Sequence, residues 1–202
     1  MREALSQLAK LPVAVIVGAQ ANDGVMTNAL QPLYRPIRLA GPVVTVEMVP
    51  GDNAAIDWAI QEAAQGAVLL IACGGDTRHA CTGDLHATLA KQRGLGGFVV
   101  DGFVRDSGPI AQMNFPVYAR GLQLRGPVKR QPGRLNVPLA IDGLVVEPGD
   151  YLFGDDDGLV LVRQARLAEV CAAALAREAK EESILAAIAA GKTTVEINGL
   201  KP

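Results

Sequence analysis

Aromatic residues, cysteines and histidines are scarce in this chain, and each shortage removes a class of structure or site. Aromatic residues make up only 4% of the 202 residues, so the core must be built from Val, Leu, Ile and Ala. The 3 cysteines are an odd and low number, which makes a disulfide framework unexpected and favours a reducing cytoplasm as the location. Cys73, His79 and Cys81 do not have the spacing of zinc ligands, and no second half-site follows them.

Strong net charge and long apolar runs are also missing. The formal net charge is −2 and the isoelectric point is about 5.7, whereas nucleic-acid partners usually need a basic face. No apolar run reaches the roughly 18 residues of a membrane-spanning helix. The N-terminus has no charged-then-apolar export pattern. We therefore expect no membrane and no direct nucleic-acid partner.

What the chain does contain is ample core material: 50% of its residues are hydrophobic. The pattern predicts a single α/β domain over residues 1–202, with parallel βαβ units in the middle, hairpins after them and a helix at the end. The expected strands are 13–17, 38–48, 67–73, 97–101 and 115–121, then three short strands within 138–162. The expected helices are 2–10, a segment between Asp52 or Asn53 and Gly66, 84–93 and 166–190, with an exposed basic loop at 122–136.

The chemistry is expected between Cys73 and Gly121. An apolar run (67–73) and a second one (97–100) flank a helix that opens at Gly83-Asp84. If the two runs are neighbouring parallel strands, the loops that follow them lie at the carboxyl edge of one sheet, where open α/β folds hold ligands.

Arg105, Asp106 and Asp84 are the candidate functional side chains at that edge. Arg105 can form two parallel hydrogen bonds to a carboxylate, and Asp106 can bind Mg²⁺, which takes few protein ligands and keeps several waters. The free N–H groups at a helix start can receive a substrate carboxylate. The plainer alternatives are a surface ion pair for Arg105-Asp106 and a helix N-cap or a first-turn acid for Asp84.

Other motifs point to ordinary structure. Either histidine, His79 or His86, could act as an acid–base group, but a polar loop or first-turn role is the simpler interpretation. Residues 155–158 (Asp-Asp-Asp-Gly) lack the ligand pattern of an EF-hand and predict a hairpin turn. Lys129, Arg130 and Arg134 form a basic cluster in a loop, which is either solvated or a contact for a polyanion or a partner. Dinucleotide-binding and α/β-hydrolase motifs are absent.

Several residues of this central stretch resemble the 4-hydroxy-4-methyl-2-oxoglutarate aldolase family. That family also contains the regulator of ribonuclease E activity A and was once labelled demethylmenaquinone methyltransferase. Its signature is an Asp, twenty residues and then Arg-Asp, which Asp84 and Arg105-Asp106 match. The resemblance covers roughly residues 18–192. Its other landmarks are Gly83, Leu85, Ala87, Ala90, Gly94, Gly97, Val100-Asp101-Gly102, Pro50-Gly51-Asp52-Asn53, 116–121, Pro148-Gly149-Asp150 and 155–158.

The resemblance implies an α/β sandwich of the swivelling β/β/α type that assembles into a trimer, sometimes a hexamer, with active sites between subunits. The implied activity is a metal-dependent (class II) aldolase, a lyase that cleaves a 4-hydroxy-2-oxo acid and releases pyruvate. Oxaloacetate decarboxylation is the implied companion activity. Mg²⁺, Mn²⁺ or another divalent metal is the implied cofactor.

Carried over residue by residue, the resemblance gives each candidate a role. Arg105 would hold the pyruvate carboxylate and the adjacent oxygen, and the backbone N–H groups of Gly83, Asp84, Leu85 and His86 would receive the same carboxylate. Asp106 would be the direct metal ligand, and Asp84 would orient a water bound to the metal. A further acid from a neighbouring subunit is expected, with Glu178, Glu181 and Glu182 as the candidates.

Two departures from the family pattern leave a second function open. Aldolases of the family tend to carry an acid three residues after the Arg-Asp aspartate, where this chain has Pro109, and His86 stands where an apolar residue is usual. Members that regulate ribonuclease E also tend to lack the acid. The alternative is a non-catalytic regulator that binds and inhibits an endoribonuclease.

Overall fold

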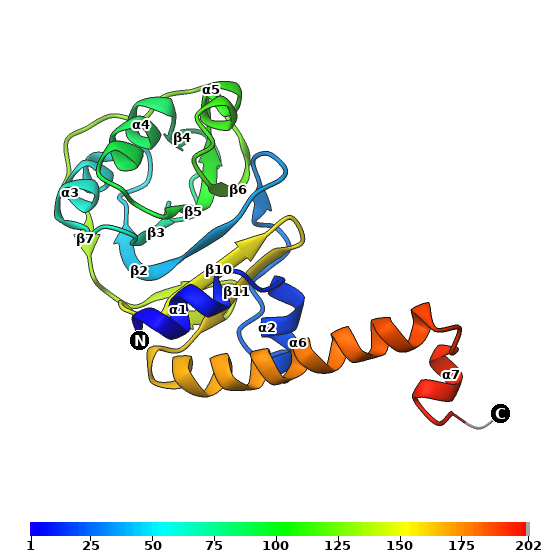
Figure 1. Cartoon of the computed structure of the whole chain (residues 1–202). Coiled ribbons are helices and arrows are strands. Elements are labelled where there is room, and N and C mark those ends of the chain that lie inside the picture. The colour runs from blue at the N-terminus through cyan, green and yellow to red at the C-terminus, as the bar shows by residue number, and fades with distance from the viewer. Residues whose placement is uncertain (201–202) are drawn as a thin grey trace.

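The computed structural model describes residues 1–200 as one α/β domain whose main sheet curls almost into a barrel (Figure 1). The helices are Arg2–Leu8 (α1), Val13–Ala19 (α2), Ala54–Glu62 (α3), Asp84–Gln92 (α4), Ser107–Gln112 (α5), Leu167–Ala189 (α6) and Thr194–Ile197 (α7), with a 3-10 turn at Gln164–Arg166 (η1). The strands are Gln31–Pro32 (β1), Leu39–Glu47 (β2), Val68–Ala72 (β3), Ala80–Thr82 (β4), Gly97–Val104 (β5), Val117–Leu122 (β6), Arg134–Leu135 (β7), Leu139–Ile141 (β8), Leu144–Val146 (β9), Tyr151–Asp155 (β10) and Gly158–Val162 (β11).

Strand β2 joins the two halves of the sheet. Its second half pairs in parallel with β3, and β3 pairs in parallel with β5, which in turn pairs in parallel with β6. Its first half pairs antiparallel with β10, the first strand of the β10–β11 hairpin. The predicted parallel pairing of the runs at 67–73 and 97–101 is therefore confirmed.

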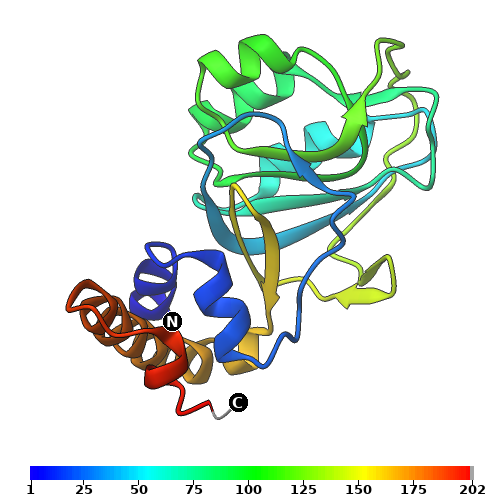
Figure 2. The same ribbon diagram turned by 90° about the vertical axis from the view of Figure 1, so that its right-hand side faces the viewer.

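Alternating side chains on the strands separate three apolar cores. On β3, Leu69 and Ile71 pack under α3, α4 and α5, whereas Val68 and Leu70 face the β10–β11 hairpin. On β10, Phe153 points to the opposite side and packs against α1, α2 and α6. Burial on both faces explains why these strands are apolar throughout. The predicted β/β/α sandwich is confirmed, with helices on its two outer sides (Figure 2).

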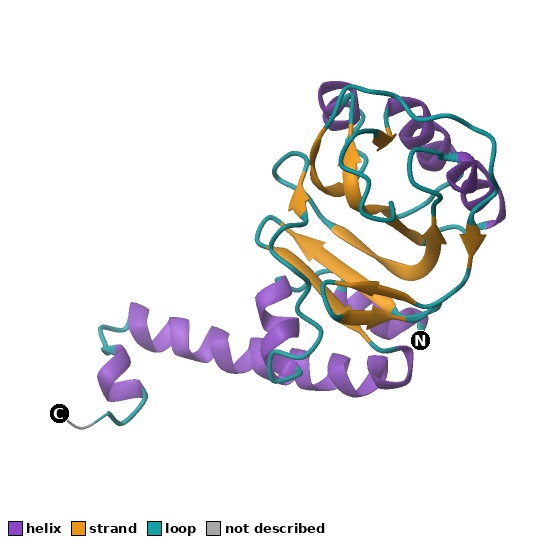
Figure 3. Cartoon of the chain, turned by 180° about the vertical axis from the view of Figure 1, so that it is seen from behind, coloured by secondary structure: helices purple, strands orange, loops and turns teal. Residues whose placement is uncertain are grey.

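The final helix, α6, packs on the body only through its first half. Its buried residues end at Ala174, and the rest of the helix extends away from the sheets (Figure 3). Leu185 and Ile188 on this outer half are exposed. No helix among residues 1–200 is long and apolar enough to span a membrane.

The prediction of a strand at 13–17 is wrong, because these residues begin helix α2. Pro12 stands at the N-cap position, and Val13 N donates to the Asp155 carboxylate at 2.8 Å. A short apolar run does not distinguish a strand from a buried helix, so contacts with α6 and the hairpin decide the outcome.

Two predicted strand boundaries are also corrected. Residues 138–162 hold four strands, not three, because the Asp142-Gly143 turn separates β8 from β9. The strand at 97–101 continues through the expected Asp101-Gly102 turn to Val104, with an irregular register opposite β6. The turn at 155–158 is a hairpin turn, as expected.

The absence of a disulfide, expected from the low number of cysteines, is also wrong. Cys73, just after β3, forms a disulfide with Cys81 on β4, although no pairing was expected. Cys171 is free and buried on α6. Gly102 on β5 lies directly against the disulfide: a Cβ at this position would sit 2.5 Å from Cys73 Sγ and 2.9 Å from Cys81 Sγ. The strand can pass the disulfide only without a side chain at this residue.

We therefore expect Gly102→Ala to be strongly destabilising. Overpacking of a buried contact should lower the free energy of unfolding by about 2–3 kcal/mol. The matched control is Gly108→Ala on α5, where an added Cβ meets no atom within 4 Å. This variant should be neutral or up to about 1 kcal/mol more stable. Urea denaturation of both variants tests the contact, and equal midpoints would show that the close approach does not exist.

Candidate active site

A pair of parallel strands, β4 and β5, brings the two predicted motifs together. Thr82 lies opposite Val104 in this pairing, and Arg105 N donates to the Thr82 carbonyl at 3.1 Å. The chain therefore leaves both strands at the same edge of the sheet, and the Gly83 and Asp106 that follow become neighbours. The predicted convergence of the helix start with Arg105-Asp106 is confirmed.

Gly83 allows the Asp106 carboxylate to reach the start of α4. A Cβ at Gly83 would overlap Asp106 Oδ2, and that oxygen lies 3.4 Å from Asp84 N and 3.3 Å from Arg105 Nε. Asp106 itself has a left-handed backbone with a φ of 60°, which Asp tolerates better than most residues. This conformation directs its carboxylate toward the helix start.

The start of α4 is open to a ligand. Gly83 occupies the N-cap position and has no side chain to cap the helix, so Asp84 is not the N-cap residue. Asp84 is the first helical residue, which agrees with the alternative of a first-turn acid. Among residues 1–200, the N–H groups of Leu85 and His86 donate to no side chain, as expected for free groups at a helix start. The partial positive charge of the helix end adds to their attraction for an anion.

A pocket of about 230 Å³ opens beside these groups, and its lining includes the candidates Arg105 and Asp106 and the residues 83–86. Its walls come from the start of α3, the β4–α4 junction, the end of β5 and the basic loop. Figure 1 shows α3 and α4 side by side over the same face of the sheet. The lining residues are Asn53, Asp57, Ala80, Thr82, Gly83, Asp84, Leu85, His86, Leu89, Arg105, Asp106, Pro127 and Lys129.

Four polar residues of this pocket were not assigned to the site from the sequence: Asn53, Asp57, Thr82 and Lys129. Lys129 belongs to the loop that was predicted to be solvated, yet its Nζ donates to Asp57 Oδ2 at 2.6 Å. The Asp52 carboxylate holds this loop in place, because it accepts from the backbone N–H groups of Arg130 and Gln131 at 2.8 and 2.9 Å.

His86 is buried between two of these residues. Its Nδ1 lies 2.9 Å from Thr82 Oγ1, and its Nε2 lies 3.0 Å from Asp57 Oδ1. Because a carboxylate only accepts, Nε2 carries the hydrogen, and Nδ1 of the neutral ring accepts from the Thr82 hydroxyl. Burial lowers the pKa of His86, and the nearby Asp57 offsets only part of this effect.

Asp57 is ionised despite its partial burial. Burial alone would raise the pKa of its carboxyl group, but the hydrogen bond from Lys129 and the positive charges nearby lower the pKa overall. The Lys129 ammonium and the Asp57 carboxylate therefore face the pocket as a compensated ion pair.

Asn53, another lining residue, has a buried oxygen without a partner. Its side chain amide nitrogen donates to the Cys81 carbonyl at 2.9 Å, and that carbonyl can only accept. Asn53 Oδ1 consequently has no donor, although the residue is only 5% exposed. Buried acceptors without a partner are rare in folded proteins.

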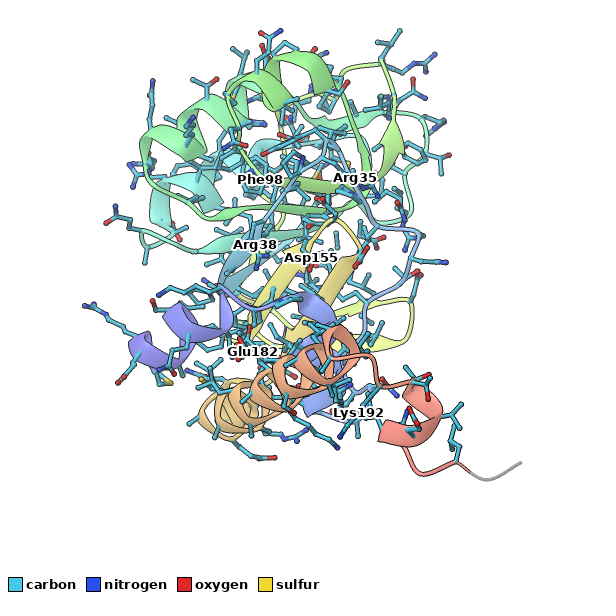
Figure 4. All side chains as sticks on the ribbon, turned by 45° about the vertical axis from the view of Figure 1, so that its right-hand side comes forward. Arg35, Arg38, Phe98, Asp155, Glu182 and Lys192 are labelled. Carbon is cyan, nitrogen blue, oxygen red and sulfur yellow. A yellow bond between two sulfur atoms is a disulfide. The ribbon has the colours of Figure 1, made fainter. Side chains whose placement is uncertain are left out.

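The remaining candidates lie outside the pocket. His79 pairs with Asp76 at 2.7 Å, in the loop after β3. The candidate acids Glu178, Glu181 and Glu182 are on α6, and none lines the pocket. Figure 4 shows Glu182 on the far side of the β10–β11 hairpin from Phe98. Within one chain these acids do not meet the site.

The acids of the pocket fit a divalent cation that keeps most of its waters. Among residues 1–200, no group of three or more His, Cys, Asp and Glu side chains has the arrangement of a metal cage. Asp84 and Asp106 both line the pocket, and Mg²⁺ is typically held by one or two carboxylates plus water. The donor set therefore suits Mg²⁺ or Mn²⁺ better than zinc.

Comparisons with known proteins identify the family of the chain. The family model described as RraA-like, Aldolase/RraA, matches residues 3–161. A relative from Halalkalibacterium halodurans, provisionally named 4-hydroxy-4-methyl-2-oxoglutarate aldolase, is 34% identical over 89% of this chain and 85% of its own length. One from Alkalilimnicola ehrlichii with the same provisional name is 35% identical over 68% of this chain and 88% of its own length.

Solved structures show the same fold. An uncharacterized protein from Pseudomonas syringae pv. tomato has a TM-score of 0.86 and 28% identity, and the match covers 100% of this chain and 95% of that one. The RNA-processing inhibitor RraA from Thermus thermophilis has a TM-score of 0.70 and 29% identity, with 76% of this chain and 93% of that one covered. The extent of the family match, with the identity to its relatives, shows that the chain belongs to the RraA-like family.

Proposed function

We propose that this protein is a divalent-metal-dependent lyase that cleaves a 4-hydroxy-2-oxo acid, such as 4-hydroxy-4-methyl-2-oxoglutarate, and releases pyruvate. One observation carries the proposal: Arg105 and Asp106 face the uncapped start of α4 inside one pocket. A guanidinium, a carboxylate and free amide hydrogens are the groups that a 2-oxo acid and a cation require. The names of the relatives support the same reaction class.

The substrate carboxylate binds between Arg105 and the start of α4 in this proposal. The Arg105 side chain is 41% exposed, so its donors remain available to a ligand despite the contact with Asp106. The N–H groups of Leu85 and His86 donate from the other side. These contacts fix the plane of the 2-oxo acid before the carbon–carbon bond breaks.

Asp106 would hold the divalent cation, and Asp84 would support it through water. When bound, the cation stabilises the negative charge that develops on the 2-oxo oxygen as the bond breaks. Oxaloacetate decarboxylation leaves the same pyruvate enolate, so the same residues serve both reactions.

We also propose that the working form is a trimer or hexamer in the cytoplasm. The site needs an acid or base in addition to Asp84, and Pro109 stands where an acidic residue was expected. Glu178, Glu181 and Glu182 lie on the projecting half of α6, and in this proposal one of them reaches the site of a neighbouring copy. Glu181 pairs with Arg177 within the chain at 2.9 Å, which leaves Glu178 and Glu182 less constrained.

A regulator of an endoribonuclease is the second candidate function. It is favoured by the likeness to the RNA-processing inhibitor RraA and by Pro109. In this function the protein binds the nuclease through its surface, and the pocket has no catalytic role.

The first prediction concerns the metal and Arg105. Pyruvate release from oxaloacetate or 4-hydroxy-4-methyl-2-oxoglutarate should stop with EDTA and return with Mg²⁺ or Mn²⁺. Loss of a preorganised charged donor should lower kcat/KM in Arg105→Ala by about 10²–10³-fold. The control is Arg93→Ala, at the opposite end of α4 and outside the pocket, which should behave as the wild type. Release that is insensitive to EDTA would refute the metal dependence.

The second prediction concerns metal binding itself. Calorimetric titration with Mn²⁺ should show one site per chain in the wild type and at least about tenfold weaker binding in Asp106→Asn, which keeps the shape but loses the charge. Asp157→Asn, in the exposed β10–β11 turn, is the control and should bind normally. Equal Mn²⁺ affinity in the wild type and Asp106→Asn would place the metal elsewhere.

The third prediction separates the two candidate functions. As a lyase, the purified protein should not slow RNA cleavage by an endoribonuclease of the ribonuclease E type. Inhibition that survives Asp106→Asn, measured with a labelled RNA, would favour the regulator, because a surface contact does not need the pocket carboxylate.

A further inference from the structure

We propose that Asp52, which does not line the pocket itself, is a positioning residue for the substrate carboxylate. Its carboxylate fixes the basic loop, and the loop in turn fixes the Arg105 guanidinium. This inference rests on the proposed lyase function and adds a residue that determines substrate affinity. It concerns residues 123–133, the part of the basic loop that joins β6 to β7.

No apolar core holds this part of the loop. None of the residues 123–133 is buried, and none belongs to the three apolar clusters. Leu124 is 87% exposed and Val128 is 48% exposed. A segment with few buried apolar contacts opens easily unless other interactions hold it. The position of the loop therefore depends on its hydrogen bonds.

Asp52 makes two of these hydrogen bonds. Its Oδ2 accepts from the N–H groups of Arg130 and Gln131 at 2.8 and 2.9 Å, and its Oδ1 accepts from Ala54 N at 3.1 Å, at the start of α3. The residue is only 2% exposed. Burial alone would raise the pKa of Asp52, but the three N–H groups and the Arg130 charge lower the pKa overall. A buried, ionised carboxylate thus holds the loop to the start of α3.

The backbone anchors the loop on both sides of residues 126–127. After them, Asn53 N donates to the Val128 carbonyl at 3.0 Å. Before them, Ala80 N donates to the Arg125 carbonyl at 2.7 Å. The two residues between these anchors therefore have a defined position beside the pocket.

Gly126 lies against the guanidinium of Arg105. A Cβ at Gly126 would sit 3.0 Å from Arg105 Nη1. The stem of the same side chain is confined by Gly83, where a Cβ would sit 3.1 Å from Arg105 Cγ. The loop therefore limits how far the guanidinium can move. Without this limit, substrate binding would have to order a long side chain, which costs conformational entropy.

The variant Asp52→Asn tests the anchor. The Asn oxygen cannot accept from both the loop and Ala54 N, because the other half of the amide only donates. We expect the KM for oxaloacetate to rise about tenfold and kcat to change by less than about twofold, since the guanidinium holds the carboxylate in the ground state and the transition state alike. The affinity for Mn²⁺ should not change, because the pairing of β4 with β5 places Asp106.

Asp150→Asn is the matched control. Asp150 is also buried, at 4% exposure, and also accepts from backbone N–H groups, those of Glu147 and Gln164, but it lies outside the pocket. This variant should be less stable than the wild type and keep the wild-type KM. A rise in KM equal to that of Asp52→Asn would overturn the inference, because general destabilisation would then be sufficient.

Gly126→Ala tests the contact with Arg105 and leaves Asp52 untouched. Gly126 is exposed and its backbone is not left-handed, so alanine fits the fold, whereas the new Cβ displaces the end of the Arg105 side chain. We expect the KM to rise at least about fivefold with an unchanged free energy of unfolding. A wild-type KM in Gly126→Ala or in Asp52→Asn would overturn the inference.

Binding of pyruvate in the presence of Mg²⁺, measured by NMR, separates the inference from the proposed function because it needs no turnover. If the wild type releases pyruvate and the variants keep its KM, the inference is overturned and the lyase function stands. If the wild type releases none but binds pyruvate at least about fivefold more tightly than both variants, the lyase function is overturned and the positioning role stands. Equal binding in that case, or no binding at all, overturns both.

Discussion

The site depends on one backbone constraint, the parallel pairing of the short strand β4 with β5. The hydrogen bond from Arg105 N to the Thr82 carbonyl makes the two chains leave the sheet side by side. Gly83 then admits the Asp106 carboxylate to the start of α4, where any Cβ would exclude it. The charged groups are thus placed mainly by backbone geometry, which is more rigid than a set of long side chains.

The sheet was predictable because its central strands are buried on both faces and so read as uninterrupted apolar runs. The run at 67–73 and the run at 97–101 follow this rule, and their parallel pairing was expected. The run at 13–17 has the same composition but folds as α2. Its helical form depends on Asp155 and α6, which lie about 140 or more residues away and leave no trace in a local pattern.

The site residues likewise fall into those that a local sequence pattern predicts and those that depend on contacts with distant residues. Asp84, Arg105 and Asp106 follow strand ends, so sheet topology alone places them at one edge. Lys129 enters the pocket only because the Asp52 carboxylate and the Asn53 N–H group hold the basic loop against the start of α3. The turn at 50–53 was noted as a family landmark, but its role as an anchor for a distant loop needs the folded structure. The polar side chains that such contacts bring into the pocket cannot be predicted from the spacing of residues along the chain.

Some residues of the pocket destabilise the folded protein. This cost argues that the pocket binds a ligand and that the protein does not act only by docking to a partner. An unsatisfied buried acceptor such as Asn53 Oδ1 costs about 1–3 kcal/mol, and a left-handed Asp such as Asp106 adds a cost of similar order. A protein that acted only through its outer surface would gain stability by relieving both. Both costs fall on residues that line one pocket, and a cation bound by the Asp106 carboxylate would offset the second of them.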